Sequence, residues 1–304
     1  MTEELKQANL KLIEKFLNST RTDNTENSYR SDLINFLESV NKSLLDIDID
    51  DINHYFNKVL LYKIDSDEKY KPRSKNRKIS SLKNFYSYLK RKKMIDDNPL
   101  EGFKKFTVDT NEETKILTKQ EVDKLLNHIK NKIKKTKSEY QEVLQIRNYA
   151  ITTLLIKTGM RIEECLNLTP EEFRMDTSEI VLVGNESKGK VSRTLYFNEK
   201  TKQIMQDYLD VRDKLNKNNL NYIFLSDNGK KMTTNSVNSL LQNYGEKCDI
   251  EGITNHKLRH YFAITFYGKY KDINLVRTAL GHSSIETTML YIHEATDVEK
   301  MRNL

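Results

Sequence analysis

Histidines cluster near the C-terminal end of this 304-residue chain. Four of its six histidines fall within 38 residues. These four are His256, His260, His282 and His293. His256 and His260 are four residues apart and would share one face of a helix, a spacing that zinc enzymes use for two metal ligands. The intervening residues are KLR, so the glutamate of H-E-x-x-H is missing and a cation, Arg259, lies in the same turn. We therefore predict no metal here.

A second pattern with chemical meaning is the segment GNESKGK at Gly184–Lys190. It matches G-x-x-x-x-G-K, the loop that holds nucleotide phosphates. The next residue is Val191, which offers no hydroxyl to Mg²⁺, and the segment leads into a β-prone run rather than a helix. ATP binding is therefore not expected.

Three other segments make chemical sense when taken together. They read TGMRIEECLNL around Arg161, the Gly184–Lys190 connection with Lys188, and HKLRH followed by LGHSSIETTMLYIH. Singly, R-x-x-E or H-x-x-R has no diagnostic value, but their order and spacing, ending in a tyrosine nine residues after Gly-His, is specific. The combination resembles the tyrosine recombinase (phage integrase) family, in the style of its two-domain Xer-like members. The resemblance covers Leu117 to the C-terminus and is weaker over the first hundred residues.

The resemblance implies a role for each matching residue. Tyr291 would be the nucleophile, and Glu164 a supporting acid. The remaining catalytic side chains would be Arg161, Lys188, His256, Arg259 and His282. Ser187 replaces the leading glycine of the family's G-K-G-x-K-x-R hairpin, so Lys190 competes with Lys188 for the lysine's place. No cofactor is implied.

The chemistry of a phosphodiester supports these roles. A phosphate anion resists attack by an anionic oxygen, so cleavage needs fixed positive charge, which two guanidinium groups supply. Tyrosine has an ordinary pKa of about 10 and needs neighbouring cations to become a nucleophile at neutral pH. The family's 3′-phosphotyrosyl bond conserves the energy of the broken ester, and a 5′-hydroxyl can then rejoin the strand without ATP.

The elements that must position these residues are expected to be mainly α-helical, because apolar residues recur at helical spacing and only three prolines and nine glycines interrupt them. We predict an N-terminal four-helix core-binding bundle over residues 1–103. Residues 104–116 lack periodicity and are predicted to be a linker. Residues 117–304 are predicted to form the catalytic domain, largely helical with a small antiparallel β-sheet. The bundle helices are expected at 5–17, 25–40, 50–62 and 75–92.

Local signals set several boundaries in the second domain. Thr118 and Glu121 form a capping-box pattern that predicts a helix start, and Gly159 is a plausible helix stop. Residues 179–183 and 193–197 are predicted to pair as a hairpin. Further helices are expected at 199–215, 234–248, 256–270 and 272–280. A second capping box, Ser283 to Glu286, would start the helix that leads to Tyr291.

The positive charge is concentrated in one segment. The chain has 51 Lys and Arg against 44 Asp and Glu, a net charge of +7. Residues 71–94 carry ten basic side chains and no acidic one, which leaves 41 against 44 elsewhere. We expect these ten to face DNA phosphates. They are Lys71, Arg73, Lys75, Arg77, Lys78, Lys83, Lys90, Arg91, Lys92 and Lys93. The alternative is a solvated helix with extended lysines.

The composition places the chain among soluble globular proteins. Hydrophobic residues make up 37% and charged residues 31%, and no apolar run approaches the roughly 18 residues of a membrane-spanning helix. The N-terminus lacks a signal-peptide pattern, so we expect a cytoplasmic protein without a membrane partner. Cys165 and Cys248 have no neighbours at metal-ligand spacing, which argues against a disulfide framework or zinc site.

We therefore expect a site-specific DNA recombinase that serves integration, excision or chromosome-dimer resolution. The resemblance implies double-stranded DNA as partner and a tetramer of identical chains on that DNA, with or without accessory recombination proteins. A type IB topoisomerase would share the chemistry, and a silent DNA-binding regulator would share the fold. The DNA target and the choice among the three biological roles stay open.

Overall fold

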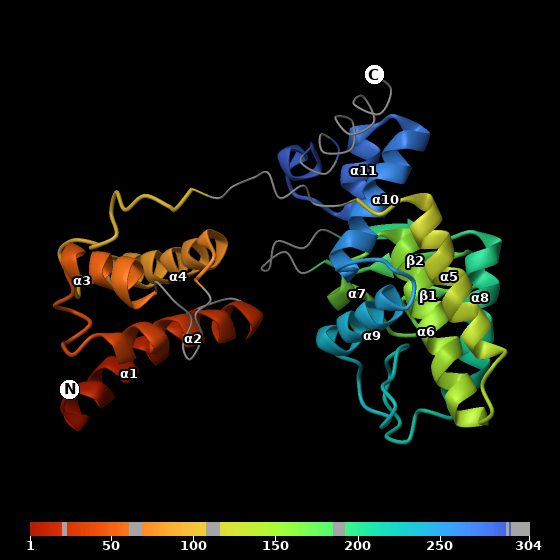
Figure 1. The fold of residues 1–304 in the computed structure, drawn as a ribbon, viewed down its shortest axis with the longest axis horizontal. Coiled ribbons are helices and arrows are strands. Elements are labelled where there is room, and N and C mark those ends of the chain that lie inside the picture. The colour runs from red at the N-terminus through yellow and green to blue at the C-terminus, as the bar shows by residue number, and fades with distance from the viewer. Residues whose placement is uncertain (20–22, 61–68, 108–115, 185–191, 290–291, 293–304) are drawn as a thin grey trace. The chain divides into compact units, whose positions relative to one another are not determined.

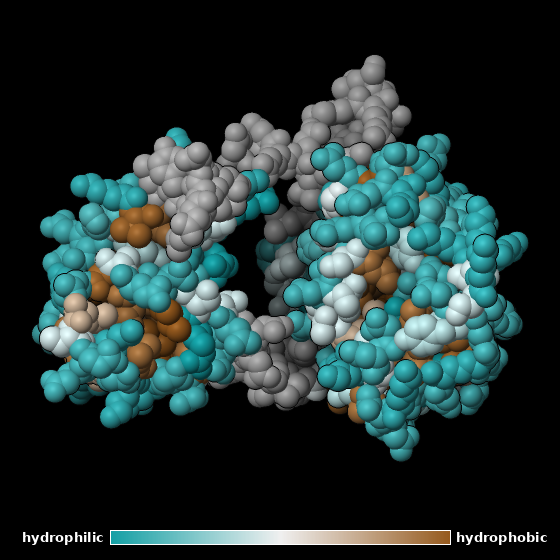
Figure 2. All heavy atoms as spheres, turned by 60° about the horizontal axis from the view of Figure 1, so that its bottom comes forward, coloured by the Kyte–Doolittle hydropathy of each residue, from teal (hydrophilic) through white to brown (hydrophobic). Residues whose placement is uncertain are grey.

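The computed structural model describes residues 1–19, 23–60, 69–107, 116–184, 192–289 and 292 (Figure 1). The chain forms two compact units, Met1–Glu113 and Thr114–Leu304. None of the described helices combines the length and the apolarity that a bilayer crossing needs. The visible face of each unit is largely hydrophilic, with apolar side chains showing as isolated patches (Figure 2).

The first unit contains the four α-helices that the periodicity predicts. They are α1 (Glu3–Leu17), α2 (Asp23–Ser39), α3 (Ile49–His54) and α4 (Pro72–Arg91). A π-helical turn, η1 (Tyr55–Val59), continues α3, so the expected helix over 50–62 has a change of pitch inside it. Aromatic rings form much of the core, where Phe16 packs against Phe85 with ring centroids 5.5 Å apart.

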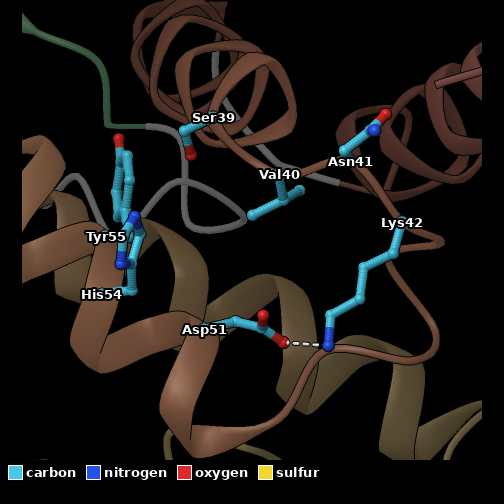
Figure 3. Close-up of a pocket in the computed structure, with 7 residues that line it drawn as sticks. All are labelled: Ser39, Val40, Asn41, Lys42, Asp51, His54 and Tyr55. Atoms are coloured by element: carbon cyan, nitrogen blue, oxygen red, sulfur yellow. Dashed lines mark ion pairs between the residues drawn. The ribbon is translucent and has the colours of Figure 1, made fainter.

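The turn before α3 is fixed by polar contacts. The Asp48 side chain accepts from the backbone N–H groups of Asp50 and Asp51, and Asp51 in turn accepts from the Asp48 N–H. Lys42 pairs with Asp51 across a hollow of about 280 Å³ (Figure 3). The hollow is lined by Ser39, Val40, Asn41, Lys42, Asp51, His54 and Tyr55. These contacts tie α3 to the segment that follows α2.

The chain beyond α4 stays attached to the first unit. Asn76 donates to the Phe106 carbonyl at 2.9 Å and accepts from the Phe106 N–H at 2.8 Å. The Phe106 ring packs on Phe56, with centroids 6.1 Å apart. The first residues of the segment predicted as a linker thus contribute to the core of this unit.

The second unit is built around one central helix. Its helices are α5 (Lys119–Ile133), α6 (Glu139–Thr158), α7 (Ile162–Asn167), α8 (Glu199–Arg212), α9 (Thr234–Glu246), α10 (Asn255–Tyr270) and α11 (Ile273–Leu280). Helix α6 packs against α5, α8 and α10. Helix α6 is apolar on several faces and not along a single stripe, as expected for a helix with neighbours on several sides. Its residues Ala150, Ile151 and Leu154 are fully buried.

A small antiparallel sheet lies beside these helices, in the order β1 (Phe173–Arg174), β2 (Glu179–Leu182), β3 (Arg193–Tyr196). The predicted hairpin is confirmed, with Ile180 opposite Leu195 and Leu182 opposite Arg193. Its connection, residues 185–191, lies outside the described residues.

The capping signals are confirmed at two of three places. The Thr118 hydroxyl accepts from the Glu121 N–H at 3.1 Å, and Glu121 accepts from the Thr118 N–H at 2.8 Å. Gly159 ends α6 with a left-handed φ of 61°. The third prediction is displaced by one residue: the helical turn begins at residue 285, and Ser284, not Ser283, has its Oγ 3.5 Å from the Thr287 nitrogen.

Two glycine-to-alanine substitutions are expected to change stability in opposite directions. At Gly159 a Cβ would lie 2.2 Å from the Phe262 ring and φ is positive, so Gly159→Ala should cost about 2–4 kcal/mol in the free energy of unfolding. Gly268 lies in α10 with nothing within 4 Å of a Cβ, so Gly268→Ala should add up to about 1 kcal/mol. Urea unfolding of both variants measures the difference, and equal effects would contradict it.

Candidate active site

The turn between α6 and α7 places Arg161 and Glu164 together. Gly159 ends α6, and Arg161 is the N-cap of α7 with Glu164 three residues on. Glu164 accepts the Arg161 backbone N–H at 2.8 Å and the Arg161 guanidinium at 3.2 Å. One carboxylate therefore caps the helix and orients the arginine that begins it.

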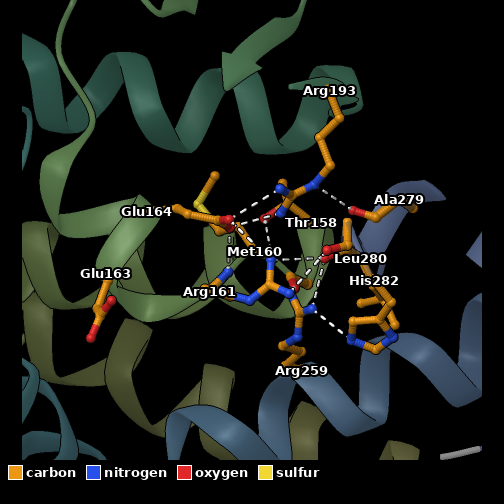
Figure 4. A network of polar contacts seen from close by, with 12 residues as sticks. Thr158, Met160, Arg161, Glu163, Glu164, Arg193, Arg259, Ala279, Leu280 and His282 are labelled. Atoms are coloured by element: carbon orange, nitrogen blue, oxygen red, sulfur yellow. Dashed lines mark hydrogen bonds and ion pairs between the residues drawn. The ribbon is translucent and has the colours of Figure 1, made fainter. Parts of the chain in front are cut away.

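The C-terminal end of α11 gathers three arginines from three other segments (Figure 4). Arg193 Nε donates to the Ala279 carbonyl at 3.0 Å. Arg161 donates to the carbonyls of Leu280 and Gly281 at 3.3 and 3.0 Å. The last carbonyls of a helix have no partners within it and carry its negative partial charge, so they attract cations.

Arg259, on the first turns of α10, is the third member of this group. Its side chain is buried, and its guanidinium donates to the Gly159 carbonyl at 2.6 Å and the Leu280 carbonyl at 2.7 Å. Gly159 thus connects both arginines of the predicted motif, since it ends the helix before Arg161 and binds Arg259. His256, three residues earlier at the start of the same helix, is exposed.

His282 follows α11 and is held at both ring nitrogens. Its Nε2 lies 2.9 Å from Arg259 Nη2, and its Nδ1 lies 2.9 Å from the Thr288 hydroxyl. A guanidinium can only donate, so Nε2 must accept and Nδ1 carries the proton. Burial, followed by the charges of Arg259 and Arg161, lowers the pKa of His282 to about 4. At neutral pH this imidazole is uncharged.

The depressed pKa of His282 predicts a loss of stability in acid. An unfolded histidine binds a proton near pH 6.5, whereas the folded one resists it down to about pH 4. The stability is complete above about pH 6.5 and falls as the pH drops toward 4, by up to about 3 kcal/mol. We expect urea unfolding between pH 7 and 4.5 to show this fall, and His282→Gln to reduce it. If the free energy of unfolding fell equally steeply with pH in the variant, His282 would not be the cause of the fall.

Arg193, on β3, stands at the arginine position of the G-K-G-x-K-x-R pattern, but no role was predicted for it. Its two terminal nitrogens donate to the two oxygens of Glu164 at 3.0 and 2.7 Å, and both side chains are buried. Burial alone would raise the pKa of Glu164, but hydrogen bonds and charge from Arg193 and Arg161 outweigh it and lower the pKa. Two signals were available: the arginine position of that pattern, and strand alternation, since Arg193 shares a strand face with the buried Leu195.

The structure brings four of the predicted residues into one network: Arg161, Glu164, Arg259 and His282. His256 is exposed at the start of α10, and its charge contributes to the lowered pKa of His282. Lys188, the competing Lys190 and Tyr291 lie outside the described residues.

The basic segment divides into buried and exposed side chains along α4. Lys78 is 4% exposed and pairs with the buried Asp32 at 3.2 Å, and Lys75 donates to the Phe56 carbonyl at 3.0 Å. We therefore correct the expected DNA-facing set by removing these two, because their ammonium groups are used within the first unit. Eight members are exposed: Lys71, Arg73, Arg77, Lys83, Lys90, Arg91, Lys92 and Lys93.

Arg77 and Lys90, although exposed, pair with acidic side chains of the same unit. Arg77 shares Asp32 with Lys78 and with the Ser81 hydroxyl, while its own side chain stays half exposed. Lys90 pairs with Asp97 and Glu101 at 3.1 and 3.0 Å. The segment's net charge toward solvent is smaller than its composition indicates.

Comparison with known proteins gives a consistent result over both units. Residues 115–297 match the model described as "Phage integrase family", and residues 8–93 match "Phage integrase, N-terminal SAM-like domain". The tyrosine recombinase XerC of Caldanaerobacter subterraneus is 30% identical, over 93% of this chain and 82% of the relative. The tyrosine recombinase XerD of Vibrio cholerae is 28% identical, over 94% and 92%.

Solved structures share the fold. The Tn1549 transposon integrase in complex with a circular intermediate DNA superposes with a TM-score of 0.70 at 18% identity, covering 97% of this chain and 98% of that one. The XerH recombinase bound to difH substrate in a post-cleavage complex gives 0.66 at 21% identity, covering 92% and 79%.

Proposed function

Since this chain belongs to the phage integrase family of tyrosine recombinases, we propose that Tyr291 is the nucleophile with which it cleaves DNA. The enzyme is a site-specific recombinase that cleaves and rejoins DNA strands through a covalent tyrosine intermediate. The observation that carries our proposal is the convergence of Arg161, Arg259 and His282 at the end of α11, where His282 lies nine residues before Tyr291 in the chain. A phosphate bound there would meet two guanidinium groups.

We propose the following division of work. Arg161, the more exposed of the two arginines, binds a non-bridging phosphate oxygen, and Arg259 stabilises the charge that develops in the transition state. Uncharged His282 accepts a hydrogen bond from Arg259 and so fixes the plane of its guanidinium. Glu164 fixes Arg161 in the same way.

The remaining steps are proton transfers. We propose that His256 accepts or relays the Tyr291 proton, because it is exposed beside the network. Lys188, with Lys190 as the alternative, delivers a proton to the departing 5′-oxygen. A 5′-hydroxyl from another strand then attacks the 3′-phosphotyrosyl bond and releases the tyrosine. Because that bond keeps the energy of the broken ester, rejoining requires neither ATP nor a metal.

The proposal extends to the whole assembly. We propose that residues 1–103 are a core-binding domain and that residues 117–304 are the catalytic domain, with the part of 104–116 beyond Phe106 as the linker between them. Both similar structures described above hold DNA, which supports double-stranded DNA as the partner. Four protomers would form the synapse in the cytoplasm, with or without accessory recombination proteins.

A nicked suicide substrate tests the proposal. Footprinting on DNA that flanks the gene would first identify a binding site. We expect the full chain to form a denaturant-resistant adduct on that site and to recombine two copies of it. Absence of an adduct on a verified site would indicate a DNA-binding regulator, and plasmid relaxation without site preference would indicate a topoisomerase.

The exposed cations at the end of α4 are expected to act through phosphate contacts. Replacing Arg91, Lys92 and Lys93 with glutamine should weaken binding to many sequences. The slope of log affinity against log salt should fall by up to about 3, since each phosphate contact contributes roughly 0.9. The matched control replaces three exposed lysines of α1, namely Lys6, Lys11 and Lys15. If the slope changed equally in both variants, the effect would come from net charge alone and not from phosphate contacts at the end of α4.

A further inference from the structure

We infer that Arg193 is a positioning residue for strand cleavage, which holds Glu164 and the end of α11 in the geometry that Arg161 needs. This inference rests on the function proposed above. Arg193 stands at the final position of the G-K-G-x-K-x-R pattern when Ser187 takes the place of its leading glycine, but a role was predicted only for the lysine of that pattern. It comes from the start of β3, 29 residues beyond Glu164 in the chain.

The contacts of Arg193 use its guanidinium from two sides. Both terminal nitrogens grip the Glu164 carboxylate, at 3.0 and 2.7 Å, while Nε donates to the Ala279 carbonyl at 3.0 Å. Such a fork against a carboxylate fixes orientation as well as distance. Arg193 therefore joins β3, α7 and α11 in one rigid unit, at 5% exposure of its side chain.

The local packing leaves Arg193 little room to move. Gly281 follows α11 with a left-handed φ of 62°, and a Cβ there would lie 2.6 Å from Arg193 Nη1. The neighbouring carbonyls of Leu280 and Gly281 accept from Arg161. Moving Arg193 would thus disturb both supports of Arg161, the carboxylate on one side and the helix end on the other.

The charges around Glu164 predict how the loss of Arg193 would appear. Glu164 faces Arg193 from β3 and Arg161 beside its own helix, and the buried Cys165 thiol is its chain neighbour. Arg259 and His282 lie across the α11 carbonyls. Without Arg193 the carboxylate would stay buried with fewer donors, so its pKa would rise and it would take up a proton at a higher pH. Protonated Glu164 orients Arg161 poorly, so cleavage would become sensitive to mild acid.

The test compares Arg193→Met and Arg193→Lys with a control on the same sheet. Arg174→Met is the control. The Arg174 side chain is 56% exposed, and its Nη1 lies 4.0 Å from Oε2 of Glu179, which is a long distance for an ion pair. The measurement is single-turnover adduct formation on a nicked substrate from pH 5.5 to 8.5, with DNA affinity and urea unfolding measured in parallel. A misplacement of about 1 Å can lower a rate about 100-fold. We therefore expect Arg193→Met to cleave about 10- to 100-fold more slowly at unchanged affinity, with its acid limb shifted to higher pH.

The outcomes separate the inference from its premise. Arg193→Lys keeps the charge and loses the fork, so its acid limb should return toward that of the unmodified enzyme while its rate stays low. Arg193→Met that unfolds more easily but cleaves with an unaltered rate and pH profile would overturn the inference. If Arg193→Met does not fold, Arg193→Lys decides alone, and a rate equal to that of the unmodified enzyme would overturn it. If the unmodified enzyme forms no adduct, the proposed function fails instead.

Discussion

Replacing Tyr291 with phenylalanine should abolish the covalent protein–DNA adduct and leave DNA affinity unchanged. The substitution removes only the oxygen that would attack the phosphorus, so binding surfaces stay intact. A missing nucleophile has no substitute among ordinary side chains, and we expect strand cleavage to fall by at least about 10⁴-fold. Denaturing gel electrophoresis on a nicked substrate, with affinity measured by mobility shift, gives both quantities.

The matched control for this variant is Tyr196→Phe. Tyr196 lies on β3 with 70% exposure, and the same oxygen is removed there from the surface of the sheet. It should cleave at the rate of the unmodified enzyme. An adduct that persists in Tyr291→Phe would show that another residue attacks, and the assignment of the nucleophile would be wrong.

Replacing Arg259 with lysine should produce the second-largest loss. Lysine keeps the positive charge but has no planar fork, so it cannot serve the Gly159 and Leu280 carbonyls, His282 and a phosphate together. Removing one donor from a preorganised anion site lowers rates by about 10²–10³-fold. We expect that loss in single-turnover cleavage, with affinity for DNA reduced much less.

Arg174→Lys is the control for Arg259→Lys. Arg174 is exposed and lies on β1, which β2 separates from β3, the strand that carries Arg193. Because Arg259 is buried, urea unfolding should accompany the kinetics. A folded Arg259→Lys enzyme that cleaves at the normal rate would contradict the role in charge stabilisation. A loss of affinity equal to the loss of rate would indicate a role in binding the ground state.

Much of the second unit could be predicted from the sequence because its signals are local. Thr118 with Glu121, and Gly159 after an apolar helix, mark boundaries through contacts within four residues. The pairing of Arg161 with Glu164 follows from the same rule, because an acid three residues after an N-cap reaches back to it. The order of the motifs also pointed to Arg259 and His282, which the structure places in the same network.

The exceptions depend on contacts between distant segments. Lys75 and Lys78 were grouped with the DNA-facing cations by charge alone. Residues 75, 78, 82, 85 and 89 alternate by three and four, so helical periodicity puts both lysines on the face of Leu82, Phe85 and Leu89. That signal was present. The partner that compensates the desolvation of the buried Lys78 ammonium is Asp32, which lies 46 residues away in the chain.

The site's three arginines all depend on the rotational phase of one short helix. Ala279, Leu280 and Gly281 are consecutive residues. The carbonyl of the first accepts from Arg193, that of the second from both Arg161 and Arg259, and that of the third from Arg161. One residue added to or deleted from α11 would turn these carbonyls by about 100° and detach all three arginines at once. The eight residues of α11 therefore act as a ruler for the site, and a change in their number should remove activity even though no catalytic side chain is altered.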